Sequence, residues 1–384
     1  MKKEKVVLVD SKDGGHHSTY IMAYAEALLE LGNTVLIFYP VIEIFGELKK
    51  KYGDKIKTIE IQKIERQNPW NSFHFLNILS LWINIKRESK KIMGRKNPDL
   101  VFFLYLDYFL SKRIGSWVLD LFFDIKWSGL FFARDINMEG NMDRMIGSKY
   151  CKFIGILEEK NNTTALLSKK FNKKTYVFPE ITNEDKAINI ETKNRINKLS
   201  HGRIVVSLLG NIAERKGIDV FSKLIGKIDS KKYFFIIAGE SPKNSSDKKM
   251  SDIIDKIKKE KNENLLLITD RVPDGPHFNT LVQCSNIIFA VYENFVQSSN
   301  IMTKAALFKK YIIVADNYFM AEKVKQYSLG VAVMEKDVNQ CMKAIENLSN
   351  NKDLDGNIIQ PRFNEYFANH SKEKLKEIFS EIEI

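Results

Sequence analysis

Residues 208–220, LLGNIAERKGIDV, place two adjacent cations in a turn between a strand and a helix. The strand ends at Gly210, and Arg215 and Lys216 come just before the helix. Arginine binds phosphate through a planar fork of N–H donors, whereas lysine acts as a point charge. The two side chains can therefore hold a diphosphate and stabilise it as a leaving group without a metal ion. The alternative is a solvated basic loop.

A carboxylate and three polar side chains surround another candidate strand end. Glu293 follows the apolar run 286–292, and Ser298, Ser299 and Asn300 precede a helix that starts near residue 301. Orphan N–H groups at a helix N-terminus, with hydroxyl and amide side chains beside them, favour a phosphate. A carboxylate in front of them can accept hydrogen bonds from sugar hydroxyls. Two serines before a helix are also a common simple cap.

The third candidate is the loop DGGHH at 13–17, which joins the first strand to the first helix. Glycines let backbone N–H groups approach a ligand, and ligands usually bind at this edge of a parallel sheet. The spacing is not G-x-G-x-x-G, so a dinucleotide site is disfavoured. The alternative is a tight turn with a hydroxyl residue as helix cap. The candidate binding residues are Gly14, Gly15, His16 and His17.

These loops require parallel sheets to hold them. Residues 5–40 contain a strand, a glycine loop, a helix and a strand, which is a βαβ unit. Continuous apolar runs are typical of strands that helices cover on both faces. Further predicted strands are 57–61, 100–106, 127–133, 153–158 and 175–179, and, after a polar stretch, 203–210, 233–240, 265–270, 286–292 and 311–316.

The length of 384 residues exceeds what one hydrophobic core supports. We therefore predict an α/β fold of two Rossmann-like doubly wound domains. The predicted parts are a first domain at 1–180, a linker at 181–202, a second domain at 203–360, and a helical tail at 361–384.

The composition is that of a globular protein, with 44% hydrophobic and 28% charged residues. Three distant cysteines argue against a disulfide framework or a zinc site and fit a reducing cytoplasm. The longest apolar runs, 71–85 and 101–110, fall short of the roughly 20 apolar residues of a spanning helix. The N-terminus has too few apolar residues for a signal peptide. We expect a cytoplasmic protein.

The net charge of +12 is unevenly distributed. Residues 49–100 contain 13 Lys or Arg and five Asp or Glu residues, a net charge of +8. Trp70, Phe73, Phe75 and Trp82 lie in the same stretch. It is either a solvated face or a surface attracted to phospholipid headgroups or a polyanionic acceptor. No nucleic-acid-binding module is recognisable, so we expect no nucleic acid partner.

Taken together, the three loops resemble those of glycosyltransferase family 4 and its close relatives, which have the GT-B fold. The loop at 13–17 resembles the family's N-terminal glycine loop. Residues 208–219 are similar to its strand-loop-RKG element, and IIAGESP at 236–242 to its Ala-Gly-Glu strand end. Residues 271–295 resemble its base-binding loop and the strand before the donor-site glutamate. The resemblance covers nearly the whole chain. It implies that the two domains face each other across a cleft, with an acceptor domain at 1–180, a nucleotide-sugar domain at 203–360, and the tail at 361–384 packing back toward the first domain.

The resemblance implies a role for particular residues. Arg215 and Lys216 would contact the donor diphosphate, Val272 the base through its backbone, and Glu293 the transferred sugar. The family pattern has a second glutamate eight residues after the first, but here Lys304 takes its place when the segments are aligned on Ala305. The other implied donor-site residues are Gly210, Gly239, Arg271, Ser298, Ser299 and Asn300. Arg134 and Asp135 occupy roughly the place of a familiar catalytic-site histidine.

The implied activity is transfer of a hexose from a UDP- or GDP-linked donor to a glycan or lipid-linked acceptor, in bacterial cell-surface polysaccharide synthesis. The resemblance further implies retention of anomeric configuration and no metal or other cofactor. We expect the enzyme in the cytoplasm, with peripheral attachment to the inner face of the membrane through 49–100. Two alternatives are a non-catalytic nucleotide-sugar or glycan-binding protein of this fold, because the second glutamate is missing, and a nucleotide-sugar epimerase.

Overall fold

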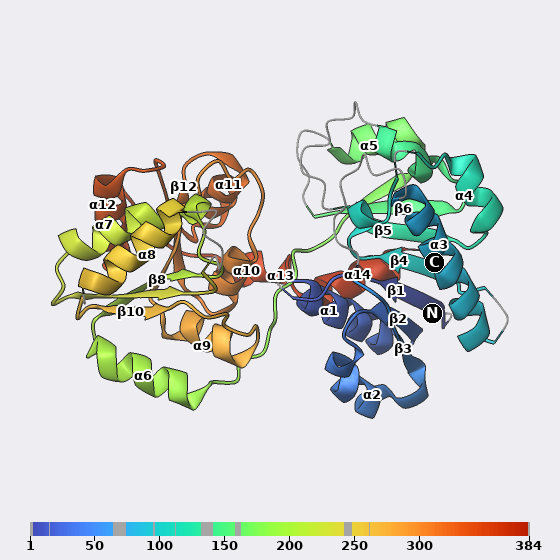
Figure 1. Ribbon diagram of the computed structural model, residues 1–384. Helices are drawn as coiled ribbons and strands as arrows, with labels where there is room; N and C mark the ends of the chain where they lie inside the picture. Colours follow the sequence, from blue (N-terminus) through green and yellow to red (C-terminus); the bar gives the residue numbers. More distant parts are fainter. Residues whose placement is uncertain are drawn as a thin grey trace. The chain divides into compact units, whose positions relative to one another are not determined.

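The computed structural model describes residues 3–14, 16–63, 74–94, 97–111, 113–131, 141–157, 163–241, 248–260 and 262–382. The chain divides into two compact units. The first comprises Met1–Ile181 with His370–Ile384, and the second comprises Thr182–Asn369. Each unit is a parallel β-sheet with helices on both faces (Figure 1).

The first unit contains a seven-stranded parallel sheet of order β3-β2-β1-β4-β5-β6-β7. Its central strands β1 and β4 are apolar and buried along nearly their whole length, as expected where helices cover both faces. The strand order reverses between β1 and β4, which is the point where ligands bind in doubly wound sheets. The strands are β1 Lys5–Val9, β2 Thr34–Tyr39, β3 Ile56–Glu60, β4 Leu100–Phe103, β5 Trp127–Phe131, β6 Cys151–Ile156 and β7 Lys174–Val177.

Alternate side chains of this sheet enter two separate cores. Val6 and Leu8 of β1 pack under helices α1 and α2, whereas Val7 and Val9 pack under α3 and α4. The helices are α1 His17–Glu30, α2 Gly46–Tyr52, α3 His74–Ile92, α4 Ser116–Phe122 and α5 Thr163–Phe171. Short 3-10 turns are η1 Ile42–Phe45, η2 Gly53–Lys55, η3 Leu106–Tyr108 and η4 Asn141–Gly147.

Helix α14, Lys372–Glu381, belongs to the first unit although it ends the chain. It lies beside α1 (Figure 1). Its apolar face inserts Leu375 and Phe379 into the core, where the Phe379 ring centroid is 5.7 Å from that of Phe102. On its polar side Lys372 pairs with Glu30 of α1 at 2.9 Å. Both faces of this amphipathic helix are therefore matched to α1 and the sheet.

The second unit contains a six-stranded parallel sheet of order β10-β9-β8-β11-β12-β13. The order reverses between β8 and β11, so this unit also has an edge of the kind at which doubly wound sheets bind ligands. The predicted pair of doubly wound domains is confirmed. The strands are β8 Ile204–Leu209, β9 Tyr233–Ala238, β10 Leu265–Ile268, β11 Ile287–Ala290, β12 Tyr311–Ala315 and β13 Gly330–Val333.

Helices cover this sheet on both faces through two cores. One core contains side chains of α7 Ile218–Lys227, α8 Lys248–Glu260 and α12 Val338–Leu348. The other contains side chains of α6 Ile190–Ser200, α9 Pro276–Cys284, α10 Asn300–Leu307, α11 Tyr318–Tyr327 and α13 Phe363–Ala368. Cys151, Cys284 and Cys341 are free. Within the described ranges, no helix is long and apolar enough to cross a membrane.

The positive stretch 49–100 does not form a single surface. Tyr52 of α2 packs against the core under α1, whereas Trp82 of α3 packs into the core on the opposite face of the sheet. Trp82 is fully buried, and its Nε1 donates to the Phe109 carbonyl at 3.0 Å. Of the two interpretations of this stretch, a membrane-facing role is therefore wrong for Trp82, because its indole completes the core. Trp70 and Phe73 lie outside the described residues.

We predict that Leu375→Ala destabilises the first unit by about 2–5 kcal/mol, the usual cost of a buried leucine side chain and the cavity it leaves. Leu375 is fully buried against α1 and the sheet. Urea unfolding measures the change. Ser380→Ala, at an exposed position of the same helix, is the matched control and should leave the midpoint unchanged. Equal midpoints for both variants would show that α14 does not dock on this core.

Candidate functional site

Arg215 and Lys216 lie at the carboxyl edge of the second sheet. They end the short turn η5, Glu214–Lys216, just before α7. The Lys216 ammonium donates to the Leu209 carbonyl at 3.0 Å, so its side chain folds back over the end of β8. Arg215 is exposed. The predicted pair of cations is thus at the edge where a parallel sheet binds ligands.

Two aromatic rings that follow β11 hold these cations. The Arg215 guanidinium carbon is 5.0 Å from the ring centroid of Phe295, and the Lys216 ammonium is 5.4 Å from that of Tyr292. Such distances allow cation–π attraction. Since Tyr292 is buried, its ring is a fixed support. The cations are therefore positioned before any ligand arrives.

Backbone contacts join the loops after β8, β9 and β11. The Glu293 amide donates to the Arg215 carbonyl at 2.7 Å. Gly217 has φ +70°, and a Cβ atom there would lie 2.6 Å from the Val291 carbonyl oxygen, so only glycine fits. Gly239 is equally restricted, because a Cβ atom would collide with the carbonyl of Gly210. The predicted glycines allow close loop packing around the cations.

The Glu293 side chain is mostly buried and forms an ion pair with Lys336, at 2.9 Å between Oε2 and Nζ. Lys336 lies in the loop after β13 and has φ +64°, an uncommon backbone conformation for a lysine. The next amide, that of Asn294, donates to Glu335 Oε1 at 3.1 Å. A loop some forty residues later therefore orients the glutamate, and nothing in the sequence spacing indicated it.

Ser298, Ser299 and Asn300 stand at the N-terminus of α10, as predicted. Ser299 occupies the N-cap position, but its side chain makes no capping hydrogen bond to the helix. Asn300 is buried, and its Oδ1 accepts a hydrogen bond from the Thr182 hydroxyl at 2.9 Å. The Asn300 amide thus helps to attach the segment that enters the second unit.

Lys304 is buried in α10, with a side chain only 3% exposed. Its ammonium contacts Asp274 Oδ1 at 2.8 Å and Asn279 Oδ1 at 2.7 Å. Burial lowers the pKa of Lys304, and the Asp274 carboxylate acts in the opposite direction. Asn279 in turn donates to the Asp185 carbonyl at 2.7 Å. At the position where the resemblance leads one to expect a glutamate, a lysine connects α9, α10 and the 182–185 segment.

Arg271 and Val272 follow β10 at the same edge of the sheet. Arg271 is exposed, and Val272 packs partly buried against the core beneath α9 and α10. The Asp274 that pairs with Lys304 lies two residues after Val272. The buried lysine therefore anchors the predicted base-binding loop.

The loop at 13–17 lies at the carboxyl edge of the first sheet. Gly14 has φ +85°, and the His17 amide donates to its carbonyl at 3.2 Å, which closes a turn. His17 Nδ1 is 2.8 Å from Oδ2 of Asp10, a fully buried carboxylate that sequence reasoning did not select. The His17 ring stacks on Tyr105 at 3.8 Å. His16 is exposed, and Gly15, Arg134 and Asp135 lie outside the described residues.

The Asp10–His17 pair is electrostatically coupled. Burial raises the pKa of the Asp10 carboxyl, whereas the hydrogen bond from His17 lowers it. With Nδ1 held by the carboxylate and the ring held by Tyr105, the imidazole has a fixed orientation. An imidazole held in this way can bind a polar ligand or exchange a proton through its other nitrogen.

No protein-family model matches the chain, and no curated protein matches it. Solved structures match it over nearly its whole length. A glycosyltransferase from Rickettsia africae ESF-5 has a TM-score of 0.67 at 16% identity and covers 99% of both chains. Sucrose-phosphate synthase from Thermosynechococcus elongatus has a TM-score of 0.69 at 13% identity, covering 99% of this chain and 98% of its own. Anabaena HepE, solved in complex with UDP-glucose, has a TM-score of 0.67 at 9% identity and covers 98% of both chains.

The chain has the GT-B fold. Both predicted domains of that fold are present, each with its own reversal of strand order. Membership of family 4 stays a prediction. So does membership of its variant subgroup with Ser-Ser-Gly before the donor-site helix, which Ser298, Ser299 and Asn300 of this chain resemble. At these identities the likeness concerns the fold, so the activity has to be argued from the side chains at the carboxyl edges.

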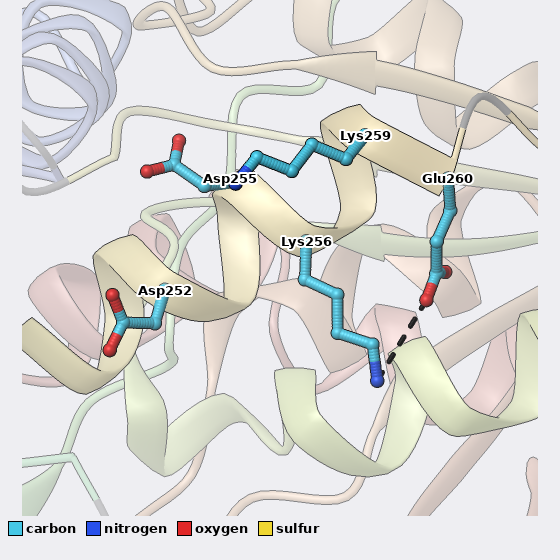
Figure 2. A pocket seen from close by; sticks show the side chains of 5 residues that line it. All are labelled: Asp252, Asp255, Lys256, Lys259 and Glu260. Carbon is cyan, nitrogen blue, oxygen red and sulfur yellow. Dashed lines mark ion pairs between the residues drawn. The ribbon is translucent and has the colours of Figure 1, made fainter.

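A hollow along α8 lies apart from these residues. All of its lining side chains come from this one helix, and Lys256 pairs with Glu260 one turn later at 3.8 Å (Figure 2). Interspersed acids and lysines on an exposed helix are typical of a solvated face. The hollow contains none of the predicted ligand-binding residues. Its lining residues are Asp252, Asp255, Lys256, Lys259 and Glu260.

We predict that Lys304→Met destabilises the second unit by about 2–3 kcal/mol, because Asn279 and Asp274 lose their buried donor while side-chain volume is retained. Urea unfolding followed by circular dichroism measures the loss. Lys343→Met, at an exposed position on α12, is the matched control and should change little. A Lys304→Met protein as stable as wild type would contradict the anchoring role.

Proposed function

We propose that the protein is a glycosyltransferase that moves a hexose from a nucleotide-linked donor to an acceptor hydroxyl. One observation carries the proposal: Arg215 and Lys216 are held at the carboxyl end of β8, and the Arg215 carbonyl accepts the backbone amide of Glu293. Two cations at the same sheet edge as the carboxylate of Glu293 suit a diphosphate joined to a sugar. The GT-B fold, shared with a Rickettsia glycosyltransferase, supports the same activity.

The donor is a UDP- or GDP-linked hexose bound by the second unit. Arg215 and Lys216 bind the diphosphate and stabilise its charge as the bond to the sugar breaks. Glu293 accepts hydrogen bonds from sugar hydroxyls, Val272 binds the base through its backbone, and Ser298 and Ser299 stand at the phosphate end of α10. The UDP-glucose in the HepE structure favours a uridine nucleotide.

The reaction retains the anomeric configuration. The acceptor oxygen forms its bond to the anomeric carbon on the face from which the diphosphate oxygen departs, and the acceptor proton passes to the departing phosphate. The similarity of residues 208–219 to the RKG element supports this route. NMR of the product's anomeric proton tests it, and an inverted product would exclude it.

The acceptor is a glycan or lipid-linked molecule of bacterial cell-surface polysaccharide synthesis, reached from the cytoplasmic side. We assign its binding to the first unit, around Gly14, His16 and His17. The buried Asp10 that orients His17 supports this assignment, since a fixed imidazole can bind a hydroxyl group.

A second candidate is a nucleotide-sugar-binding protein without turnover. The observation that favours it is Lys304, whose ammonium faces Asp274 and Asn279 within the core. A thermal-shift screen of UDP- and GDP-sugars, followed by an assay of nucleotide release, separates the two. A ligand at a hundredfold excess over its Kd stabilises by about 2.7 kcal/mol. Binding without any release favours the second candidate.

We predict that Arg215→Ala and Lys216→Ala each slow the transfer. Each should lose about 2–4 kcal/mol of transition-state stabilisation, the usual effect of removing one preorganised electrostatic donor. The rate of nucleotide release measures the effect, and circular dichroism confirms the fold. Lys223→Ala, an exposed lysine of α7, is the control for loss of a nearby charge. Near-normal rates in both site variants would disprove the diphosphate assignment.

We predict that EDTA leaves the activity unchanged, because the two cations already neutralise the diphosphate. The only Asp-x-Asp sequence, at residues 353–355, is an exposed turn in which Asp353 accepts the amides of Asp355 and Asn357. These hydrogen bonds lower the pKa of Asp353. Activity that is lost on chelation and restored by magnesium or manganese would refute metal independence.

A further inference from the structure

Helices α3 and α4 lie side by side on one face of the first sheet. The Lys86 ammonium of α3 donates to the Phe122 carbonyl at the end of α4 at 3.0 Å. Their inner sides share one core, in which the Trp82 ring is 4.7 Å from that of Phe123. The inner sides of the two helices are therefore fully used by packing.

Their outer sides carry large apolar side chains that no core covers. Leu76 and Ile83 are seven residues apart on α3, and Trp117 and Leu121 are four apart on α4, spacings that place each pair on one helix face. Trp117 is 71% exposed and Leu121 69%. We call these residues with Phe122 the α3–α4 surface. Isolated exposed leucines are ordinary, but five large apolar residues on neighbouring helices are not.

Positive charge lies beside this apolar surface. Helix α3 contains four cations and one acid, which are Lys86, Arg87, Lys90, Lys91 and Glu88. Lys86 also pairs with Asp124 just after α4, at 2.8 Å. Arg87 and Lys91 share the single carboxylate of Glu88 and are 71% and 76% exposed. With Asp120 of α4 and Asp124 included, four cations stand against three acids, and Arg87 and Lys91 extend into solvent.

We propose that the α3–α4 surface docks on an anionic lipid bilayer. Tryptophan, leucine and phenylalanine enter the boundary between headgroups and acyl chains, and neighbouring lysine and arginine side chains contact lipid phosphates. The five apolar side chains of the α3–α4 surface suit the acyl-chain side of this boundary. The neighbouring cations suit the phosphate side. The sequence predicts docking through 49–100, by the apolar face of a helix at 71–85 and the cations that continue it. The structure adds Trp117 and Leu121 of α4 to this surface and removes the buried Trp82 from it. The docking does not depend on the transfer reaction.

Co-sedimentation of the full chain with vesicles tests the proposal. Wild type should bind phosphatidylglycerol-containing vesicles, bind pure phosphatidylcholine vesicles far less, and dissociate as salt is added. Trp117→Ser/Leu121→Ser should weaken binding about tenfold or more, because the inserting side chains are lost. Ile358→Ser, equally exposed at 76% but in the second unit, should bind like wild type.

A charge variant separates electrostatic attraction from insertion. Arg87→Gln/Lys91→Gln leaves the Lys86–Asp124 pair intact and should reduce both binding and its dependence on salt. Lys258→Gln/Lys259→Gln, two exposed lysines of α8, removes equal charge from the second unit and should have little effect. Equal losses in both variants would show nonspecific attraction and overturn the proposal.

Tryptophan fluorescence reports the depth of Trp117. Trp82 and Trp127 are fully buried, and Trp70 is replaced by phenylalanine in both proteins compared, so a blue shift with anionic vesicles and quenching by brominated lipid should disappear when Trp117→Phe is added. A wild-type protein that ignores anionic vesicles at low salt overturns the proposal. Binding that is unchanged in Trp117→Ser/Leu121→Ser also overturns the proposal. A protein partner would then be the better candidate for the α3–α4 surface.

Discussion

The close approach of backbone to backbone at the carboxyl edge of the second sheet is the constraint on which the site depends. Gly239 touches Gly210, Gly217 touches Val291, and the Glu293 amide binds the Arg215 carbonyl. A side chain at Gly239 or at Gly217 would push the loops apart. Because the loops meet in this way, two cations and a carboxylate from distant parts of the chain share one edge of the sheet.

Buried charge fixes the loops that these backbone contacts do not reach. Lys304 attaches the loop after β10 through Asp274, and Asp10 in the first unit attaches the loop before α1 through His17. Burying a charge without a partner costs a large free energy. Lys304 therefore needs Asp274, and Asp10 needs His17, to remain in place in the folded protein. In both units, buried pairs therefore hold loops at the carboxyl edge of the sheet in fixed positions.

Helices α3 and α4 on the first sheet carry large apolar side chains on both their inner and their outer sides. Helix α3 directs Trp82 inward to complete a core of aromatic rings, and leaves Leu76 and Ile83 on its outer side. Helix α4 does the same with Leu119 inside and Trp117 outside. A helix that is apolar on both sides usually has a partner on both sides.

The order of apolar runs and loops in the sequence was sufficient to predict the parallel sheets, the two units and the edge at which Arg215, Lys216 and Glu293 lie, because strand and helix periods are local properties. The roles of Lys336, Asp10 and Lys304 were not predictable, since each depends on a partner brought close only by folding. For the same reason, the sequence did not show that Trp82 is buried or that the stretch 49–100 is divided between two faces of the sheet. A sequence shows that aromatic and charged residues are neighbours along the chain, but which face of the sheet each one reaches is decided by how the helices cross it.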